Sequence, residues 1–257
     1  MLFDQLGRFN CDLIAKNSYK NSRYYFTLDS NIKKKIILKN IYQNSVEFFN
    51  EKIKISYEVF ETKINFLINK ISNEELIKNL NNCVYIPFLF PKLKEKDLGK
   101  NIKNIFIPSL VAAYKKIFPN YLFVNYYKDE LENSMIFTKE SRYEYFLKNT
   151  DKEDTIGILF FTLNEFSFSE SELAIKKLPE IFNLSGGYEI MAALIGMPNL
   201  LFKKDKYPPL LWFSSFRKYN DENIGFHIEP YGYNLTFNKR AHLNLSAEYW
   251  WHSITVK

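Results

Sequence analysis

Residues 156–163 form a nearly unbroken apolar run, Ile-Gly-Ile-Leu-Phe-Phe-Thr-Leu. A half-exposed strand alternates apolar and polar side chains, and a surface helix keeps one polar side. This run does neither, so it has to be buried whatever its secondary structure. With 257 residues, of which 46% are hydrophobic and 18% aromatic, the chain has ample material for a core and is not intrinsically disordered.

The remaining patterns alternate between helical and strand-like segments and predict an α+β fold. Helices are predicted at residues 2–16, 72–80, 98–118, 140–147 and 169–182. Strands are predicted at residues 23–28, 34–41, 53–59 and 121–127, and residues 188–197 fit either state. Capping boxes are expected where Ser72 precedes Glu75 and where Ser169 precedes Glu172, while Gly186-Gly187 marks a helix stop. Pro108 is expected to kink or divide the long helix around it.

The last fifty residues have a different pattern. Short β-like runs at 210–216, 224–228, 233–237 and 242–256 are separated by turn residues, as in a small antiparallel sheet. We therefore expect a mixed helical and strand body at 1–203 and a β-rich C-terminal module at 204–257 packed on it. The boundary rests only on the Lys203-to-Pro209 stretch, so one domain is also compatible with the sequence.

The charge balance is mildly basic, with 35 Lys and Arg against 29 Asp and Glu. Thirty of the 35 are lysine, and we attribute much of this excess to A/T-rich codons. Nucleic-acid binders favour arginine for bidentate contacts, so no nucleic-acid partner is predicted. The densest cluster, Lys33 to Lys35 with Lys39, is expected on a solvated face.

The location of the protein is predicted to be cytoplasmic. Asp4 and Arg8 interrupt what would be the apolar part of a signal peptide. No apolar run approaches the roughly 18 residues that a membrane-spanning helix needs. Cys11 and Cys83 lie in no CxxC pair and are expected to be buried thiols in a reducing compartment.

Three histidines, His227, His242 and His252, lie close to the end of the sequence. Together they could bind a metal or carry out acid–base chemistry, but their spacing matches no familiar zinc motif. We favour half-buried positions beside aromatic residues. Residues 151–154, Asp-Lys-Glu-Asp, are expected to form a solvated turn because they lack the spaced oxygens of a calcium loop. No metal, cofactor or catalytic residue is predicted.

A nuclease is the competing enzymatic hypothesis. Glu61-Thr62-Lys63 matches the ExK half of a metal-dependent nuclease site and follows a predicted strand, with Asp29 upstream. Such a site would need both carboxylates to converge on Mg²⁺ and the lysine to approach the phosphate.

The aromatic residues at Tyr249-Trp250-Trp251 are more informative. Adjacent side chains of a strand point to opposite faces, so the two tryptophans cannot enter one core. At least one of them is expected at an edge, an interface or a second layer. Together with Phe106 and Tyr114, these three residues are the predicted interface candidates.

Several segments resemble TssG-type baseplate subunits of type VI secretion systems. Residues 93–98, Leu-Lys-Glu-Lys-Asp-Leu, lead into Asn104-Ile105-Phe106 and then residues 109–116, which together are similar to that family's long helix. The opening Leu2-Phe3-Asp4-Gln5-Leu6, the segment 24–28 and the segment 173–190 also resemble it. The chain lacks the family's gly-pro-x-gly segment, has Glu61 to Asn65 near that place, and has Pro108 inside the helix.

The resemblance implies a divergent, non-catalytic wedge subunit that packs against TssF-type and TssK-type partners and docks toward the sheath and spike. The predicted function is therefore a structural or interaction subunit of a multi-protein assembly. A Mg²⁺-dependent nuclease-like toxin and an immunity or antitoxin protein stay open as alternatives.

Overall fold

A mixed β-sheet runs through the part of the chain that the computed structural model describes, residues 1–14, 30–50, 52–127, 130–203 and 208–257. Its strands follow the order β1-β4-β10-β6-β8-β9-β2, and β5 pairs with β10 beside β6. The strands are β1 (Tyr85–Phe90), β2 (Phe123–Asn125), β4 (Thr155–Asn164), β5 (Asn183–Leu184), β6 (Leu210–Trp212), β8 (Gly225–Tyr231), β9 (Asn234–Arg240) and β10 (Trp250–Val256). A separate antiparallel pair joins β3 (Met135–Phe137) to β7 (Phe216–Lys218).

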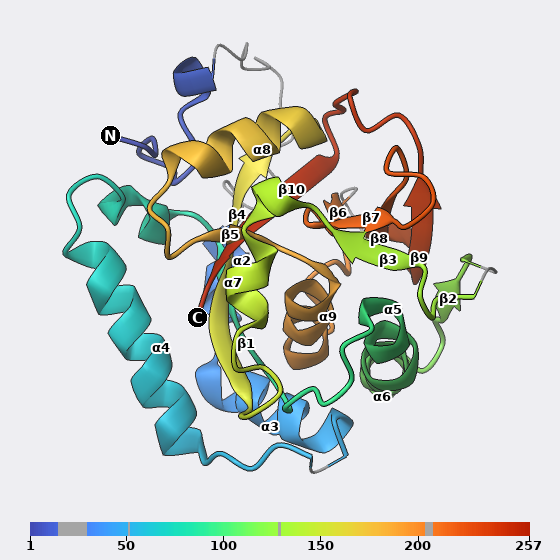
Figure 1. Cartoon of the computed structure of the whole chain (residues 1–257). Helices are drawn as coiled ribbons and strands as arrows, with labels where there is room; N and C mark the ends of the chain where they lie inside the picture. The colour runs from blue at the N-terminus through green and yellow to red at the C-terminus, as the bar shows by residue number, and fades with distance from the viewer. Residues whose placement is uncertain (15–29, 51, 128–129, 204–207) are drawn as a thin grey trace.

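Helices pack around this sheet, which confirms the α+β class. They are η1 (Cys11–Ile14), α2 (Ser30–Lys34), α3 (Leu38–Phe48), α4 (Tyr57–Ser72), η2 (Lys78–Asn82), α5 (Leu98–Asn101), η3 (Ile102–Phe106), α6 (Ile107–Ile117), η4 (Lys139–Ser141), α7 (Tyr143–Leu147), α8 (Phe168–Lys177) and α9 (Gly187–Gly196). The central helix α9 packs against α3, β1 and α6, while α4 lies along the outside and α8 contacts β5 at the top of the view (Figure 1).

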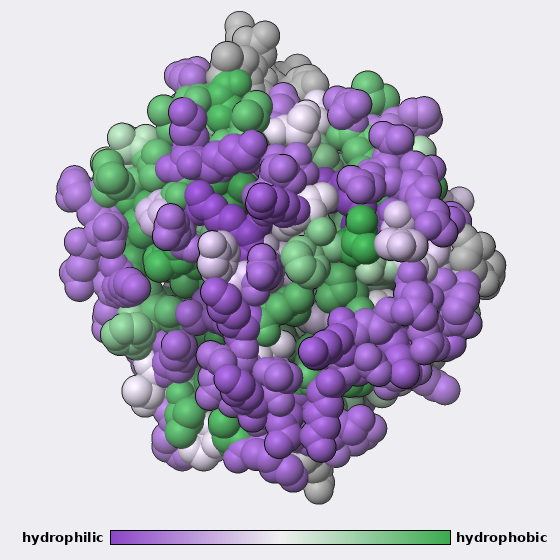
Figure 2. Space-filling view, viewed as in Figure 1, coloured by the Kyte–Doolittle hydropathy of each residue, from purple (hydrophilic) through white to green (hydrophobic). Residues whose placement is uncertain are grey.

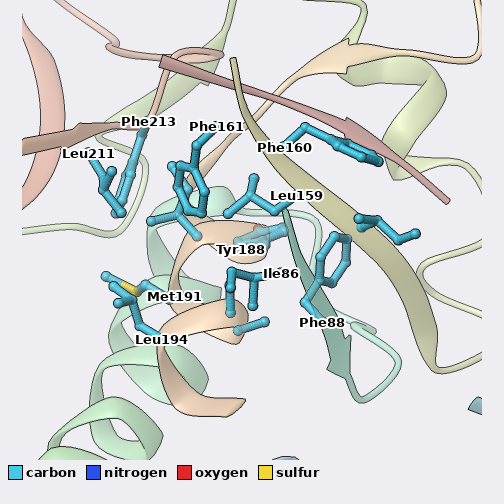
Figure 3. Packing of buried hydrophobic residues seen from close by; sticks show 14 of the residues in the cluster. Ile86, Phe88, Leu159, Phe160, Phe161, Tyr188, Met191, Leu194, Leu211 and Phe213 are labelled. Carbon is cyan, nitrogen blue, oxygen red and sulfur yellow. The ribbon is translucent and has the colours of Figure 1, made fainter. Parts of the chain in front are cut away.

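The apolar run at 156–163 forms most of β4, which pairs with β1 on one side and β10 on the other. Its side chains are buried on both faces of the sheet. Leu159 and Phe161 lie over Tyr188 of α9 (Figure 3), whereas Phe160 points to the other face, where its ring centroid is 6.5 Å from that of Phe182. Double-sided burial explains why this strand shows no apolar and polar alternation.

The strand-rich C-terminal region is confirmed, and it contributes to the main sheet. β10 lies between β4 and β6, pairing antiparallel with the first and parallel with the second. Strands from both sides of residue 203 therefore share one sheet, although the division into two domains stays a prediction. The predicted strand at 242–256 is shorter than expected, because β10 begins at Trp250.

The long helix predicted at 98–118 is present and divided as expected. A π-helical segment, η3, separates α5 from α6 and ends just before Pro108, which lies in the first turn of α6. Proline has no N–H and its ring displaces the preceding turn, so a wider turn ahead of it relieves the clash. The short helix near 140–147 and the strand near 121–127 are also confirmed.

The strand predicted at 53–59 is wrong. Ser56 is the N-cap of α4, and its hydroxyl accepts a hydrogen bond from the Val59 N–H at 3.4 Å. The helix then buries Phe60, Ile64 and Leu67, whose helical spacing prevails over the short alternating stretch before it.

Two other N-terminal predictions fail in the described residues. The strand at 34–41 is wrong because α3 begins at Leu38. The helix at 2–16 is wrong because Phe3 bridges to Phe9 across a turn at Gly7, whose φ of 79° a helix does not allow. The strand predicted at 23–28 lies outside the described residues.

The helix predicted at 72–80 is wrong, because turns follow the end of α4 at Ser72 and residues 78–82 form the short 3-10 helix η2. Ser72 ends α4, and its hydroxyl donates to the Ile68 carbonyl, so it caps no helix. The capping box of α8 uses Ser167 and Glu170, two residues earlier than predicted. Gly186 begins α9 rather than following a helix, and residues 188–197 are helical. Every residue of α9 is buried, which is why its sequence has no polar side.

Candidate interaction surface

The tryptophans at the start of β10 are divided between two cores. Trp251 joins the main hydrophobic cluster, whereas Trp250 packs with Trp212 in a second cluster on the other face of the sheet. Their exposed fractions are 1% and 5%. The prediction of a second layer is confirmed. Both rings are core residues of this chain and present no surface to a partner.

Two further interface candidates are also enclosed. Phe106 stacks on Tyr188 of α9 with ring centroids 4.8 Å apart, and its side chain is fully buried. Tyr114 is 3% exposed, and its hydroxyl donates a 2.6 Å hydrogen bond to the Tyr233 carbonyl. Tyr249 alone is half-buried, with its hydroxyl accepting from Arg240 Nη1 at 3.0 Å. α9 packs against η3 and α6, and this contact between distant segments does not follow from the local sequence pattern.

The three histidines do not converge. His227 and His252 pack beside Trp212, with ring centroids 5.1 and 6.2 Å from it, as predicted, but they are fully buried rather than half-buried. His242 is exposed, in a left-handed conformation. Burial lowers the pKa of His227 despite its 3.1 Å contact with Glu229, so its imidazole is neutral near pH 7.

His252 also lies next to a hydroxyl group, with 2.9 Å between its Nδ1 and the Oγ of Ser214. Both side chains are completely buried, so no substrate reaches the pair in this conformation. Three other nitrogens of the same face have no hydrogen-bond partner within the described chain: Trp212 Nε1, Trp250 Nε1 and His227 Nδ1.

The ExK residues are not arranged as a nuclease site needs. Glu61 and Lys63 lie two positions apart on helix α4, where their side chains diverge by about 200° around the axis. Glu61 accepts a 2.6 Å hydrogen bond from the Tyr57 hydroxyl. Asp29 lies outside the described residues. Across the residues that the structure describes, no group of three or more His, Cys, Asp or Glu side chains could hold a metal ion.

A cavity of about 400 Å³ opens between the start of α4 and the turn at 151–154. Lys63, Lys257, Glu153 and Asp154 line it together with apolar side chains. Asp154 is already engaged, since its carboxylate accepts hydrogen bonds from the N–H groups of Lys54, Ile55 and Lys92. Because two lysines face two acidic residues, the charge of this cavity selects no single class of ligand.

Among the strands that the structure describes, β2 ends the main sheet, with β9 as its paired neighbour, on the right of Figure 1. Val124 pairs with Thr236 of β9, on the side of the sheet opposite the core residue Leu235. Leu122 and Tyr126 lie two positions to either side, so alternation places them on the same outward side. Their exposed fractions are 62% and 48%.

Tyr231, at the end of β8, extends this group of side chains. It pairs with Asn234 of β9, two positions from Thr236, and therefore faces the same side as Val124. Its exposed fraction is 72%, the highest among the large apolar side chains of the described residues. We call the four residues Leu122, Val124, Tyr126 and Tyr231 the edge surface.

A rigid base supports the edge surface. Leu122 donates its backbone N–H to the Asn234 side chain at 2.8 Å, and the Tyr126 N–H bonds to the Phe237 carbonyl at 2.9 Å. Phe118, which precedes β2 in the chain, stacks on Phe202 with ring centroids 4.0 Å apart. The Tyr114 hydroxyl donates to the Tyr233 carbonyl in the turn between β8 and β9, and so links α6 to this hairpin. Burial raises the pKa of Tyr114. Exposed side chains on a fixed backbone lose little backbone entropy when a partner binds.

On the face shown in Figure 2, hydrophobic residues form separate groups among hydrophilic ones. The spacing of Leu122, Val124 and Tyr126 predicts that their side chains share one face of a strand. It does not predict that this strand lies at the end of the sheet. Among the described residues, no helix is long and apolar enough to cross a membrane.

The chain matches no family model, no curated protein and no solved structure in comparisons with known proteins.

Proposed function

We propose that this protein is a non-catalytic interaction subunit of a multi-protein assembly and that its edge surface contacts a neighbouring subunit. The observation that carries the proposal is the set of apolar side chains on the open end of a well-supported sheet. Tyrosine and large aliphatic residues supply much of the binding energy in protein interfaces when water is excluded around them. Phe123 points to the opposite face of β2 and packs against the core beside Leu235. The face of β2 that carries the edge surface is therefore available to a partner.

The specific form of the proposal is a baseplate wedge subunit of a type VI secretion system acting in the cytoplasm. It rests on the sequence resemblance, which spans the α5 to α6 helix. The Phe118 ring, which supports the edge surface, lies directly after that helix. The partners would then be TssF-type and TssK-type subunits and components of the sheath and spike.

Co-expression with the products of neighbouring genes tests this function. We expect a stable complex by size-exclusion chromatography, and we expect the double variant Leu122→Ser/Tyr126→Ser to lose it. The matched control is Leu76→Ser/Tyr219→Ser, because Leu76 and Tyr219 have similar exposed fractions of 57% and 60%. A wild-type chain that stays a monomer with every neighbour, or an edge-surface variant that still assembles, would overturn the proposal.

An immunity or antitoxin protein is the second candidate, and the basic balance of the chain favours it where the partner is acidic. The two functions differ in the identity of the partner. Sheath and tube genes beside this one support the assembly subunit, whereas an adjacent toxin gene whose product binds the chain supports the immunity protein.

A further inference from the structure

The cavity beside α4 is lined by the side chain of Lys257, which follows directly after β10. Its Nζ donates hydrogen bonds to the Phe146 and Lys148 carbonyls at the end of α7. Within the described residues it forms no ion pair with a carboxylate. The two carbonyls take both N–H groups of a neutral amine, whereas an ammonium would carry a third N–H with only solvent to accept it. The hydrogen bonds of Lys257 are therefore complete when its amine is neutral.

The surroundings of Lys257 also favour loss of its proton. Burial lowers its pKa to about 8, and the charge of Lys63 acts in the same direction, although Glu153 and Glu189 oppose it. Lys63 lines the same cavity, and the apolar part of the cavity wall consists of Ile55, Val59 and Ile156. An amine in a partly apolar pocket beside a second cation is the setting that activates lysine as a nucleophile.

We propose that this cavity binds a small aldehyde or ketone and that the Lys257 amine joins it as an imine. The amine nitrogen forms a bond to the carbonyl carbon, and the two amine hydrogens leave with the carbonyl oxygen as one molecule of water. No oxidant or reductant is needed. The protonated imine keeps one N–H, which can stay on the Phe146 carbonyl, while the Lys148 carbonyl lies on the exposed side and can bond to water.

The rest of the cavity suits this chemistry. Its volume of about 400 Å³ and its apolar wall accommodate a carbonyl compound with a short hydrocarbon chain. Loss of water from the first adduct is helped by an acid, and Glu153 lines the same cavity. Asp154 does not serve, because three backbone N–H groups already hold its carboxylate. The cavity shares no residue with the edge surface, so this inference goes beyond the proposed function and stands or falls without it.

Reductive trapping with butanal and sodium cyanoborohydride at neutral pH tests the inference. Reduction converts the imine into a stable butyl-lysine, whose position peptide mass spectrometry identifies. At pH 7 roughly a tenth of the amines with a pKa near 8 are neutral, against fewer than about one in a thousand for a lysine in water. We therefore expect Lys257 to be labelled at least about tenfold faster than the exposed Lys139. Labelling of Lys257 no faster than that of Lys139 would overturn the proposal.

Two matched variants show whether the reaction needs the cavity. Val59→Trp fills part of the space but leaves the amine in place, and it should slow labelling of Lys257 by butanal about tenfold. Phe66→Trp lies on the same helix outside the cavity wall and should leave the rate unchanged; the exposed fractions of Val59 and Phe66 are 51% and 58%. Equal rates in the two variants would show that Lys257 reacts as a surface amine, which contradicts the proposal.

Pyruvate and acetone, trapped in the same way, distinguish an anionic from a neutral carbonyl compound. Faster labelling of Lys257 by pyruvate, with the advantage lost in Lys63→Met, would assign the site to an oxo acid whose carboxylate pairs with Lys63. Equal rates would assign it to a neutral aldehyde or ketone. Lys63→Met should also slow labelling by butanal, because loss of the neighbouring charge raises the pKa of Lys257. If butyrate binds in the cavity but butanal leaves no adduct on Lys257, the cavity is a carboxylate site and the imine is excluded.

Discussion

The hydroxyl of Tyr143 donates a 2.7 Å hydrogen bond to the carboxylate of Glu189, and both side chains are completely buried. The same carboxylate accepts the Gly186 N–H at 3.0 Å at the start of α9. The pair therefore joins α7 to the central helix. Burial raises the pKa of Glu189 to about 7, although the hydrogen bonds from Tyr143 and Gly186 act in the opposite direction.

Glu189 is expected to make stability depend on pH between about 4.5 and 7. The unfolded chain loses this proton near its ordinary pKa of 4.5, whereas the folded chain keeps it until about pH 7. The protonated carboxyl therefore favours the folded state at low pH, and this contribution is lost as pH rises. Relative to Glu189→Gln, the wild type should lose about 2 to 3 kcal/mol of unfolding free energy over that range.

Urea unfolding at half-unit pH steps measures this difference. Glu144→Gln, an exposed carboxyl on α7, is the control and should follow the wild type. Parallel curves for the wild type and Glu189→Gln would show that the buried carboxyl has an ordinary pKa.

Removal of the Tyr143 hydroxyl should both destabilise the fold and move this pH dependence. Tyr143→Phe leaves the ring in place but takes one donor from the buried carboxylate, at a cost of about 1 to 2 kcal/mol. Because that hydrogen bond lowers the pKa of Glu189, its loss shifts the stability decline to higher pH. Tyr145→Phe, on the same helix with a ring 61% exposed, should change neither. Equal unfolding curves for the two variants would contradict the prediction.

How far the sequence predicts this fold depends on what each segment contacts. The buried strand at 156–163 was predictable as buried because nothing in it could face water. The division of Trp250 and Trp251 between two cores was predictable from strand alternation alone. Residues 53–59 alternate just as clearly, yet they enter α4, because Ser56 and the apolar positions beyond it fix a helix that packs on the sheet.

The candidate surface was harder to predict than the core. Sequence reasoning selected aromatic residues such as Trp250 and Phe106 for the interface, but their exposure depends on which segments fold over them. Leu122 and Tyr126 lie in a predicted strand, and only the strand order shows that this strand ends the sheet. Strand order is set by contacts between distant segments, which local patterns do not contain.

The ion pair between Arg217 and Glu172 should contribute more to stability than ion pairs on the surface. Arg217 Nη2 lies 2.9 Å from Glu172 Oε1, its guanidinium stacks over Phe168, and burial lowers its pKa to about 10. Burial also raises the pKa of Glu172. Glu172→Gln leaves an enclosed cation without its counter-charge and should cost about 1 to 3 kcal/mol, less than a fully buried pair because Glu172 is partly exposed.

Denaturant unfolding at pH 7 measures that cost against Glu75→Gln, which breaks an exposed pair with Lys78 and should cost under about 1 kcal/mol. The double variant Glu172→Gln/Arg217→Met should recover part of the loss, since it removes the unpaired charge as well. If Glu172→Gln and Glu75→Gln have the same effect, Arg217 is solvated well enough to need no partner.

Gly157 is the position where the apolar strand β4 tolerates no side chain. A Cβ there would lie 2.5 Å from the Phe88 ring and 2.5 Å from the Val256 carbonyl oxygen, on both strands that pair with β4. The carbonyl is part of the sheet backbone and cannot rotate away, so Gly157→Ala should cost about 1 to 3 kcal/mol. Gly196→Ala is the comparison, because its Cβ meets the Cγ2 methyl of the Ile41 side chain at 2.8 Å rather than a sheet carbonyl, and alanine favours the helix. Thermal unfolding should show a lower Tm for Gly157→Ala than for Gly196→Ala, and the reverse order would mean that the two neighbouring strands can separate to admit a methyl group.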